Sequence, residues 1–316
     1  MFPELVRVPI LDESLPAYFT LLVVGFALAT FSAARATKKW GLDREVMIDL
    51  GLHALIAGVL GARLLHVIAD GYFFDYVNLC VDPAKVVWRV SRARCESTGF
   101  GGVWDAAAGQ CHPAEGDCFA WAAFWRGGLT YYGGFVVASV YAWWFLRRER
   151  FPFLKAADAA GFAVPLGLFF GRLGCFLGGC CFGTEHHGWL AVVFPPGSAA
   201  SEAQFRAGQL AHEMMASLPV HPTQLYEALA CLVVAAVALF VVTPRKRFDG
   251  QVFLSFVILY AIARFAVETL RADDRGGALQ LSTSQILSLA AAAAAVPLWV
   301  ALTRRSQRLL RATGAA

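Results

Sequence analysis

Long apolar runs separated by short polar ones dominate the chain. Seven stretches of about 20 residues are almost entirely apolar, the length that crosses roughly 30 Å of hydrocarbon as a helix. They cover residues 15–34, 48–69, 128–146, 157–181, 224–242, 251–270 and 284–302. Such continuous runs lack the alternation of membrane β-strands. The pattern predicts an all-α integral membrane protein, a single transmembrane domain of seven transmembrane helices.

Basic residues predict which helix ends face the cytoplasm. They gather after the first, third, fifth and seventh runs: Arg35, Lys38 and Lys39; Arg147, Arg148, Arg150 and Lys155; Arg245, Lys246 and Arg247; Arg304, Arg305, Arg308 and Arg311. The positive-inside rule then places the N-terminus outside and the C-terminus in the cytoplasm. The net charge of +4 reflects these clusters. No basic face interleaved with aromatic residues is apparent, so we expect no nucleic-acid partner.

Two long loops fall on the predicted outer side, at residues 70–127 and 182–223. The first carries four cysteines, Cys80, Cys95, Cys111 and Cys118. An oxidising compartment favours one or two disulfides among them, and the sequence leaves the pairing open. A zinc site that includes His112 is the alternative. The second loop is expected to form an outward head.

Three arginines lie within the predicted helices, where an ionisable group indicates function unless it is paired. Arg63, Arg172 and Arg264 each lie 13 to 15 residues from the inner helix end. At 1.5 Å per residue this is roughly 20–22 Å up, in the outer half of the bilayer. Two interpretations follow: an internal network with Glu227 and Glu268, or a site for a lipid phosphate, which guanidinium groups bind in a bidentate manner.

Further polar residues are expected near the same depth. Tyr260 shares a helix face with Arg264, and the outer ends of two other helices carry Tyr131, Tyr132, His221, Gln224 and Tyr226. Cys175, Cys180 and Cys181 stand at the outer end of the fourth helix among glycines. They are either small packing residues or groups for thiol chemistry, including a further disulfide. Cys231 is expected to pack inside its helix.

Six motifs, in order along the chain, resemble those of prolipoprotein diacylglyceryl transferases. They are GGLTYYGG at residues 127–134, GRLGCF at 171–176 with Gly183, FPPGS at 194–198, HPTQLYE at 221–227, Tyr260 through Arg264 to Glu268, and SQILS at 284–288. They extend over nearly the whole chain.

The resemblance implies a bacterial cytoplasmic (inner) membrane enzyme of lipoprotein biosynthesis whose active face points to the periplasm. Such an enzyme moves the diacylglyceryl group from phosphatidylglycerol to the lipobox cysteine thiol of a prolipoprotein, with no cofactor and no metal. Matching positions imply catalytic roles for Arg172, Arg264, Tyr260, Tyr132 and Glu268. They imply substrate-binding roles for Arg63, Gly174, Cys175, Gly183, His221, Gln224 and Tyr226.

The chain departs from the family pattern at three positions and in one loop. Tyr132 replaces a histidine, Cys175 and Cys180 replace an asparagine and a glutamate, and the cysteine-bearing loop is foreign to the family. The base that deprotonates the acceptor thiol is therefore open between Tyr132, His221 and the substrate itself. Two other functions are open: a lipid-binding or transport protein without chemistry, and a membrane thiol-redox or metal protein that uses Cys175, Cys180 and Cys181.

Overall fold

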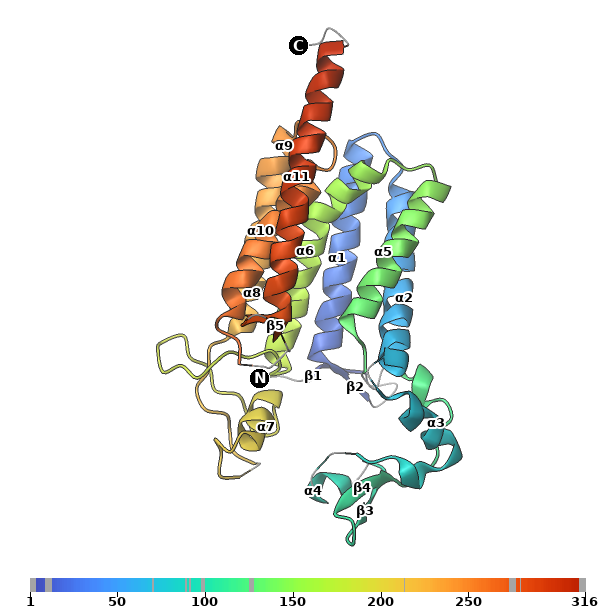
Figure 1. Ribbon diagram of the computed structural model, residues 1–316, viewed down its shortest axis with the longest axis vertical. Helices are drawn as coiled ribbons and strands as arrows, with labels where there is room; N and C mark the ends of the chain where they lie inside the picture. The colour runs from blue at the N-terminus through green and yellow to red at the C-terminus, as the bar shows by residue number, and fades with distance from the viewer. Residues whose placement is uncertain are drawn as a thin grey trace. The chain divides into compact units, whose positions relative to one another are not determined.

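The computed structural model describes residues 4–8, 13–69, 71–88, 90, 92–97, 100–124, 128–212, 214–272, 277–278 and 280–312. Of the motif residues above, Gly127 lies outside these ranges. The chain forms two compact units, one of Met1–Ile48 with Pro152–Ala316 and one of Asp49–Phe151. Both consist mainly of helices (Figure 1).

Helix α6 (Phe153–Leu177) lies between the other long helices of the first unit. It packs against α1 (Ala17–Lys39), α8 (Thr223–Ala236) and α10 (Gln251–Glu268), and α10 packs against α11 (Thr283–Ala312) (Figure 1). Glycines allow the close approach of α1 and α6. A Cβ atom on Gly25 would lie 2.6 Å from the Cβ of Phe170, and one on Gly174 would lie 2.9 Å from the Cα of Tyr18. Small residues therefore allow these two helices to pack closely.

Short elements complete the first unit. Strands β1 (Glu4–Val8) and β2 (Glu13–Pro16) form one antiparallel hairpin, and β5 (Gly277–Ala278) and β6 (Leu281–Ser282) form another. Helix α7 (Ala199–Arg206) lies in the second predicted outer loop, and the Ser198 side chain caps it by accepting a hydrogen bond from the Ser201 amide. Helix α8 continues through a π-helical turn, η4 (Val237–Val242), into α9 (Thr243–Arg245), an irregularity that the apolar pattern does not predict.

A buried carboxylate joins α6 to the start of α10. Asp158 is fully buried, and its two oxygens accept hydrogen bonds from the backbone amides of Gly250, at 3.0 Å, and Val252, at 2.8 Å. The ammonium of Lys246 lies 2.9 Å from Asp158 and 2.9 Å from Asp249. Although partial burial lowers the pKa of Lys246, these hydrogen bonds to Asp249 and Asp158 raise it overall. Asp158 therefore both caps the N-terminus of α10 and forms an ion pair with Lys246.

The second unit contains α2 (Arg44–Ala69) from Asp49 onward, and α5 (Tyr131–Arg148). Between them come α3 (Phe73–Val81), η1 (Pro83–Lys85), α4 (Arg92–Cys95), β3 (Gly102–Asp105), β4 (Gln110–Pro113) and η2 (Ala120–Ala122). Helices α2 and α5 meet at glycines, since a Cβ on Gly61 would lie 2.5 Å from the carbonyl oxygen of Gly133. Strands β3 and β4 form an antiparallel hairpin.

Two nested disulfides link the segments between α2 and α5. Cys95 bonds to Cys111 inside the longer loop that the Cys80–Cys118 bond closes. The predicted disulfides are confirmed, and the pairing is now fixed. The alternative of a zinc site at these cysteines is wrong, because all four sulfurs are used in disulfides. His112 instead places its Nδ1 2.8 Å from the carbonyl oxygen of Val86.

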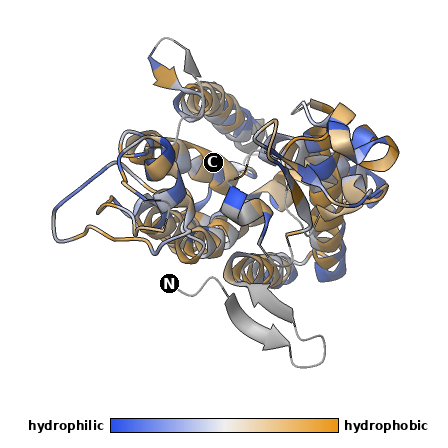
Figure 2. Cartoon of the chain, turned by 90° about the horizontal axis from the view of Figure 1, so that it is seen from below, coloured by the Kyte–Doolittle hydropathy of each residue, from blue (hydrophilic) through white to orange (hydrophobic). Residues whose placement is uncertain are grey.

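Six helices in the described part of the chain are long and apolar enough to cross a membrane. They are Ala17–Lys39, Arg44–Ala69, Phe153–Leu177, Thr223–Arg245, Gln251–Glu268 and Thr283–Arg308. Helix α5 is not among them; its 18 residues include three tyrosines, two tryptophans and two arginines. Apolar residues cover the long helices in Figure 2, and Leu60, Phe240 and Ile262 are each more than half exposed. The chain is therefore a multi-pass membrane protein.

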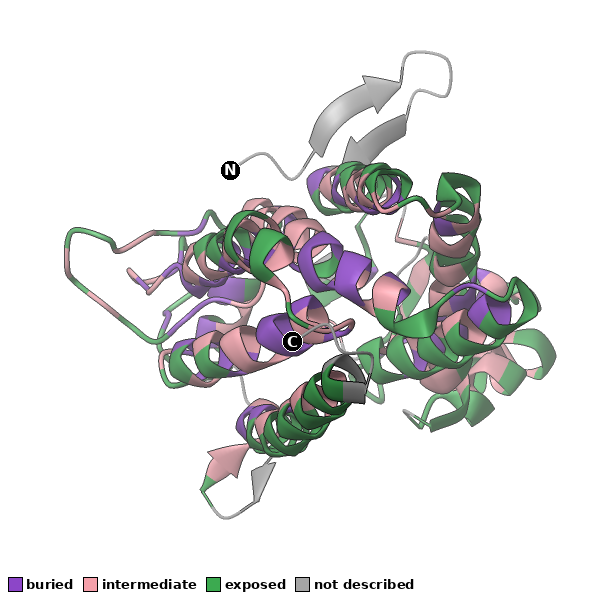
Figure 3. Ribbon diagram, turned by 90° about the horizontal axis from the view of Figure 1, so that it is seen from above, coloured by how far each residue is buried: buried purple, intermediate pink, exposed green. Residues whose placement is uncertain are grey.

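Burial is uneven among the long helices (Figure 3). Helices α6, α8 and α10 carry most of the buried positions of the first unit, whereas the spanning part of α11 is largely exposed. A charged group on α6, α8 or α10 can therefore be shielded by protein on several sides. The predicted ionic residues of the first unit lie on these three helices.

Candidate active site

Glu227 of α8 lies at the centre of an ionic network in the first unit. Its side chain is 1% exposed, and its Oε1 lies 3.0 Å from Arg172 Nη2 of α6. The same Oε1 accepts a hydrogen bond of 2.9 Å from the hydroxyl of Tyr260, and Oε2 lies 3.3 Å from Arg264 Nη1. Tyr260 and Arg264 are four residues apart on α10 and so face the same way. One carboxylate thus holds two guanidinium groups and a phenol.

Glu268 continues the network one helical turn beyond Arg264. Its Oε2 pairs with Arg264 Nη2, and its Oε1 accepts a 2.8 Å hydrogen bond from Ser282 Oγ. Arg264 Nη2 also donates to Ser284 Oγ at 3.0 Å. The Nε of Arg271 lies 3.8 Å from Glu268 Oε2. Arg264 is consequently fixed from both ends of its guanidinium.

Five ionic side chains make up the described part of the network. Three guanidinium groups, of Arg172, Arg264 and Arg271, face two carboxylates, of Glu227 and Glu268. Arg172 has 18% of its side chain exposed and Arg264 only 8%. Among the paired groups, Arg172 is thus the cation that an incoming anion can reach more easily, and guanidinium suits a phosphate.

The predicted internal Arg–Glu network is present in the structure, and the anion site on the same residues stays a prediction. Arg172 and Arg264 come together as the sequence predicts. Arg63 belongs to the second unit, where its guanidinium donates to the carbonyl oxygens of Trp121, Ala120 and Gly128. The guanidinium carbon also lies 5.1 Å from the centre of the Tyr76 ring, a cation–π contact. A shared site for all three arginines stays a prediction.

The start of α8 holds the chain that follows α6. Thr223 Oγ1 donates to the Cys181 carbonyl at 2.8 Å, and Gln224 Nε2 donates to the Cys180 carbonyl at 2.7 Å. Gln224 is fully buried, and its Oε1 has no hydrogen-bond partner among the described residues. Gln224 therefore positions this segment, while its predicted contact with substrate stays a prediction.

Two imidazole rings stack near the start of α8: His221, two residues before the helix, and His186 from earlier in the chain. The rings of His186 and His221 are 3.8 Å apart and nearly parallel, and His221 Nδ1 lies 3.2 Å from the hydroxyl of Tyr226. Burial, and then the charge of His186, lower the pKa of His221. The neutral form of His221 is favoured, which is the form that a base requires.

The predicted glycine positions are sites of close packing. A Cβ on Gly183 would lie 2.6 Å from the carbonyl oxygen of Leu270 and 2.7 Å from the Cβ of His221. Gly174 is equally confined by Tyr18. Tyr132 lies in the second unit, partly exposed, with its ring against Tyr131. The substrate contacts implied for these residues stay predictions.

The chain leaves α6 four residues earlier than the apolar pattern predicts. The helix ends at Leu177, and Gly179 adopts φ = +69°. The Gly179 amide donates to the Phe176 carbonyl at 3.2 Å and the Cys180 amide to the Cys175 carbonyl at 3.1 Å, which is the Schellman pattern of helix termination. Cys180 and Cys181 thus lie beyond the helix, which corrects the predicted end at residue 181.

Two residues of the network, Arg271 and Ser282, were not predicted from the sequence. They lie between α10 and α11, where no apolar period marks them. Ser284 begins the SQILS motif, but its contact with Arg264 was not predicted. Arg271 follows Glu268 by three residues, and this spacing alone indicated in the sequence that the two could form an ion pair.

Comparison with known proteins decides the family. The family model for prolipoprotein diacylglyceryl transferase matches residues 6–90 and 112–301. The chain belongs to the prolipoprotein diacylglyceryl transferase family. It is similar to the phosphatidylglycerol–prolipoprotein diacylglyceryl transferase of Corynebacterium diphtheriae, with 28% identity over 289 residues, 91% of this chain and 88% of the relative.

Two other relatives carry the same name. The one from Clostridium tetani is 24% identical over 272 residues, 86% of this chain and 87% of the relative. The one from Stenotrophomonas maltophilia is 36% identical over 177 residues, 52% of this chain and 58% of the relative. The family match leaves out residues 91–111, which hold Cys95, Cys111, strand β3 and the first half of β4. The part foreign to the family is thus narrower than the predicted insert of residues 70–127.

Proposed function

We propose that this chain transfers the diacylglyceryl group of phosphatidylglycerol to the lipobox cysteine thiol of prolipoproteins. Family membership and the shared name of its relatives support this reaction. The observation that carries it is the pairing of Arg172 and Arg264 around Glu227, with the Arg172 side chain the more exposed of the two. A phospholipid phosphate is the anion available at that depth.

In the proposed reaction the thiol sulfur attacks the glycerol carbon that bears the phosphate ester. A sulfur–carbon bond forms, the carbon–oxygen bond breaks, and glycerol phosphate leaves with the electron pair. The thiol proton passes to a base or to the departing phosphate. The phosphate charge grows from −1 toward −2 as the bond breaks, so a preorganised guanidinium group binds the transition state more strongly than the lipid.

Roles in this reaction follow from the contacts. Arg172, the more exposed arginine, receives the phosphate, and Arg264 supports the leaving group. Glu227 and Glu268 are positioning residues that fix the two guanidinium groups, and Tyr260 donates to Glu227. His221, whose pKa is lowered by burial and by His186, is our candidate for the base, with Tyr132 and the substrate itself as the alternatives.

We further propose that α5 is a seventh span and that the chain lies in the bacterial cytoplasmic membrane with its N-terminus and active face toward the periplasm. The basic clusters at alternate helix ends support this orientation. Two disulfides between α2 and α5 support an oxidising compartment for that segment. Labelling of engineered cysteines with a membrane-impermeant reagent at residues 115 and 304 tests it: label at 115 alone is expected, and label at 304 alone would reverse the topology.

The transfer is tested with vesicles that contain the purified chain, phosphatidylglycerol with labelled acyl chains and a lipobox peptide. Label is expected on the peptide thiol, and a peptide with serine in place of the cysteine is expected to remain unlabelled. Arg172→Ala and Arg264→Ala are expected to lower the rate by roughly 10²–10³-fold, the usual loss for one charge-stabilising donor. Arg304→Ala, an exposed arginine of α11, is the matched control. Equal rates for all three variants would remove the proposal.

A lipid-binding protein without chemistry is the second candidate. In the same vesicles, retained but unconsumed labelled lipid would identify this function.

A further inference from the structure

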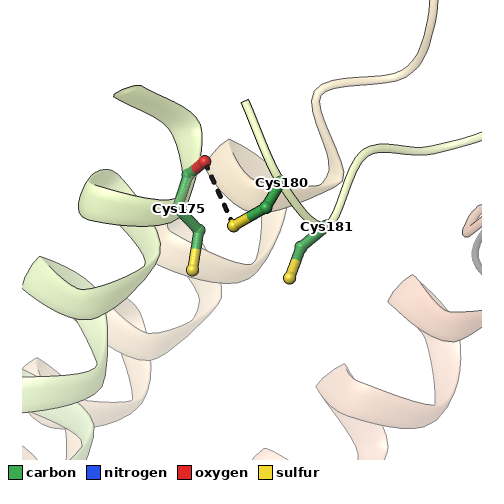
Figure 4. A group of neighbouring side chains, drawn as sticks. All are labelled: Cys175, Cys180 and Cys181. Atoms are coloured by element: carbon green, nitrogen blue, oxygen red, sulfur yellow. Dashed lines mark hydrogen bonds between the residues drawn. The ribbon is translucent and has the colours of Figure 1, made fainter. Parts of the chain in front are cut away.

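We propose that Cys175, Cys180 and Cys181 form a binding site for a single thiophilic monovalent metal ion, Cu⁺. Their three sulfur atoms all lie within 4.8 Å of one another. Figure 4 shows the three side chains close together: Cys175 lies on the last turn of α6, and Cys180 and Cys181 lie on the segment that follows it. None of the three is in a disulfide.

The helix end itself creates the juxtaposition. In a Schellman termination the residue two positions beyond the cap returns to the last turn of the helix, where it usually makes an apolar contact. Here those two positions are Cys180 and Cys175, linked by their backbone hydrogen bond of 3.1 Å. The Cys180 thiol also donates to the Cys175 carbonyl at 3.7 Å, the dashed line in Figure 4. Two sulfurs are therefore brought together by backbone geometry alone.

The third sulfur belongs to Cys181, which, like Gly179, has a left-handed backbone conformation. Cys181 has φ = +63°, a conformation that costs free energy for any residue with a side chain. The α8 N-terminus stabilises this turn, since Thr223 and Gln224 donate to the carbonyls of Cys181 and Cys180. Strain of this kind is concentrated at functional sites. A small packing residue would not need it.

The distances suit a metal ion. A metal about 2.3 Å from each of three sulfurs in a plane separates those sulfurs by about 4 Å. The present separations, all within 4.8 Å, need only small side-chain rotations to reach that value. Thiolate ligands select soft ions such as Cu⁺ and Zn²⁺.

The number of ligands and the neighbouring charges favour Cu⁺ over Zn²⁺. Structural zinc sites take four protein ligands, and this group has three members among the described residues. Binding of Cu⁺ with release of three thiol protons leaves a charge of −2 on the cluster. Arg271 hydrogen-bonds Cys181, and Arg172 interacts electrostatically with Cys175 and Cys181. Two guanidinium groups thus flank the site and offset that charge.

The test uses the full chain in detergent micelles, kept under argon with its disulfides intact and without added reductant, and titrated with Cu⁺ in competition with the chelator bathocuproine disulfonate. One Cu⁺ per chain is expected to stay with the protein. The triple variant Cys175→Ser, Cys180→Ser, Cys181→Ser is expected to lose that equivalent. Cys231→Ser, which removes the other cysteine outside the disulfides, is expected to keep it. The disulfide cysteines are present in all variants, so they cannot account for a difference.

Single variants and the unmodified chain keep the test decisive if the triple variant does not fold. Each single serine variant is expected to weaken Cu⁺ binding by more than the roughly 10–100-fold loss typical of residues that merely orient a ligand. In the unmodified chain, Cu⁺ is expected to protect these three thiols from iodoacetamide, read out by peptide mass spectrometry. Full Cu⁺ binding by the triple variant, or no protection, would overturn the site. Displacement of Cu⁺ by equimolar Zn²⁺ would overturn the choice of ion.

Discussion

Replacement of Glu227 by glutamine tests the network most directly. The substitution keeps the shape of the side chain and the acceptor for Tyr260, but it removes the negative charge that lies 3.0 Å from Arg172 and 3.3 Å from Arg264. Removing one partner of a buried ion pair costs about 3–5 kcal/mol, because the other charge stays buried without compensation. Part of that cost is relieved for Arg264 by Glu268, so we expect about 3 kcal/mol, the lower end of the range.

The free energy of unfolding is measured by titrating mixed micelles with sodium dodecyl sulfate while following tryptophan fluorescence. A loss of about 3 kcal/mol corresponds to roughly a 10²-fold shift in the folded-to-unfolded ratio. Glu149→Gln is the matched control, since Glu149 is partly exposed at the end of α5 and 3.9 Å from Arg148. Such a surface pair contributes about 0–1 kcal/mol.

Transfer activity should fall as well, because both guanidinium groups lose the carboxylate that fixes them. A displacement of about 1 Å at a catalytic group can cost roughly 10²-fold in rate. The double variant Glu227→Gln with Arg264→Gln should be less destabilised than the sum of the two single variants, since it removes both charges of one pair. Additive losses, or a Glu227→Gln variant as stable as Glu149→Gln, would refute the network as a buried ionic cluster.

Three further outcomes are expected. Asp158→Asn should destabilise the chain by about 3–5 kcal/mol, because the buried carboxylate pairs with Lys246. Since the pKa of Lys246 is raised, that pair should contribute fully below the ordinary lysine pKa of ~10.4 and be lost as the pH rises through the raised value. Gly183→Ala should cost about 1–3 kcal/mol by overpacking. Because the pKa of His221 is lowered, stability should be full above pH ~6.5 and fall as the pH drops below it, and His186→Gln should flatten this dependence in thermal melts.

Each of these has a control within the chain. Asp249→Asn removes a partly exposed partner of the same lysine and should cost no more than about 1 kcal/mol. Gly167→Ala adds a methyl group 3.6 Å from the Cβ of Ala29, an ordinary contact, and should be tolerated. His187→Gln changes an exposed neighbour and should leave the pH profile unaltered. Equal effects from a variant and its control would contradict the corresponding interpretation.

The positions of the long helices were accessible from the sequence because the apolar period is a local property. That is why Arg172 and Arg264 could be predicted to meet. The role of Glu227 as the shared partner was not accessible, since it depends on the rotation of α8 against α6 and α10. Arg271 was missed because it follows the end of α10, beyond any helical period.

Among the cysteines too, contacts that depend on local sequence could be predicted more readily than contacts that depend on the fold. The pairing of Cys95 with Cys111 depends on the fold of the segment between α2 and α5, and four cysteines permit three pairings. The approach of Cys180 to Cys175 follows from a glycine-induced helix end. Residues Gly178 and Gly179 carried that signal, but the apolar run continued past them and masked it.

The nested disulfides make residues 91–111 a removable module. The Trp88 amide donates a hydrogen bond of 2.8 Å to the Cys111 carbonyl, so the residues on either side of this segment are already in contact. A short linker from residue 88 to residue 112 would remove little more than the segment that the family match leaves out, while the Cys80–Cys118 bond still ties the flanking segments. The same junction offers a place to graft an epitope or a fluorophore-binding peptide onto this membrane enzyme without entering any of its spanning helices.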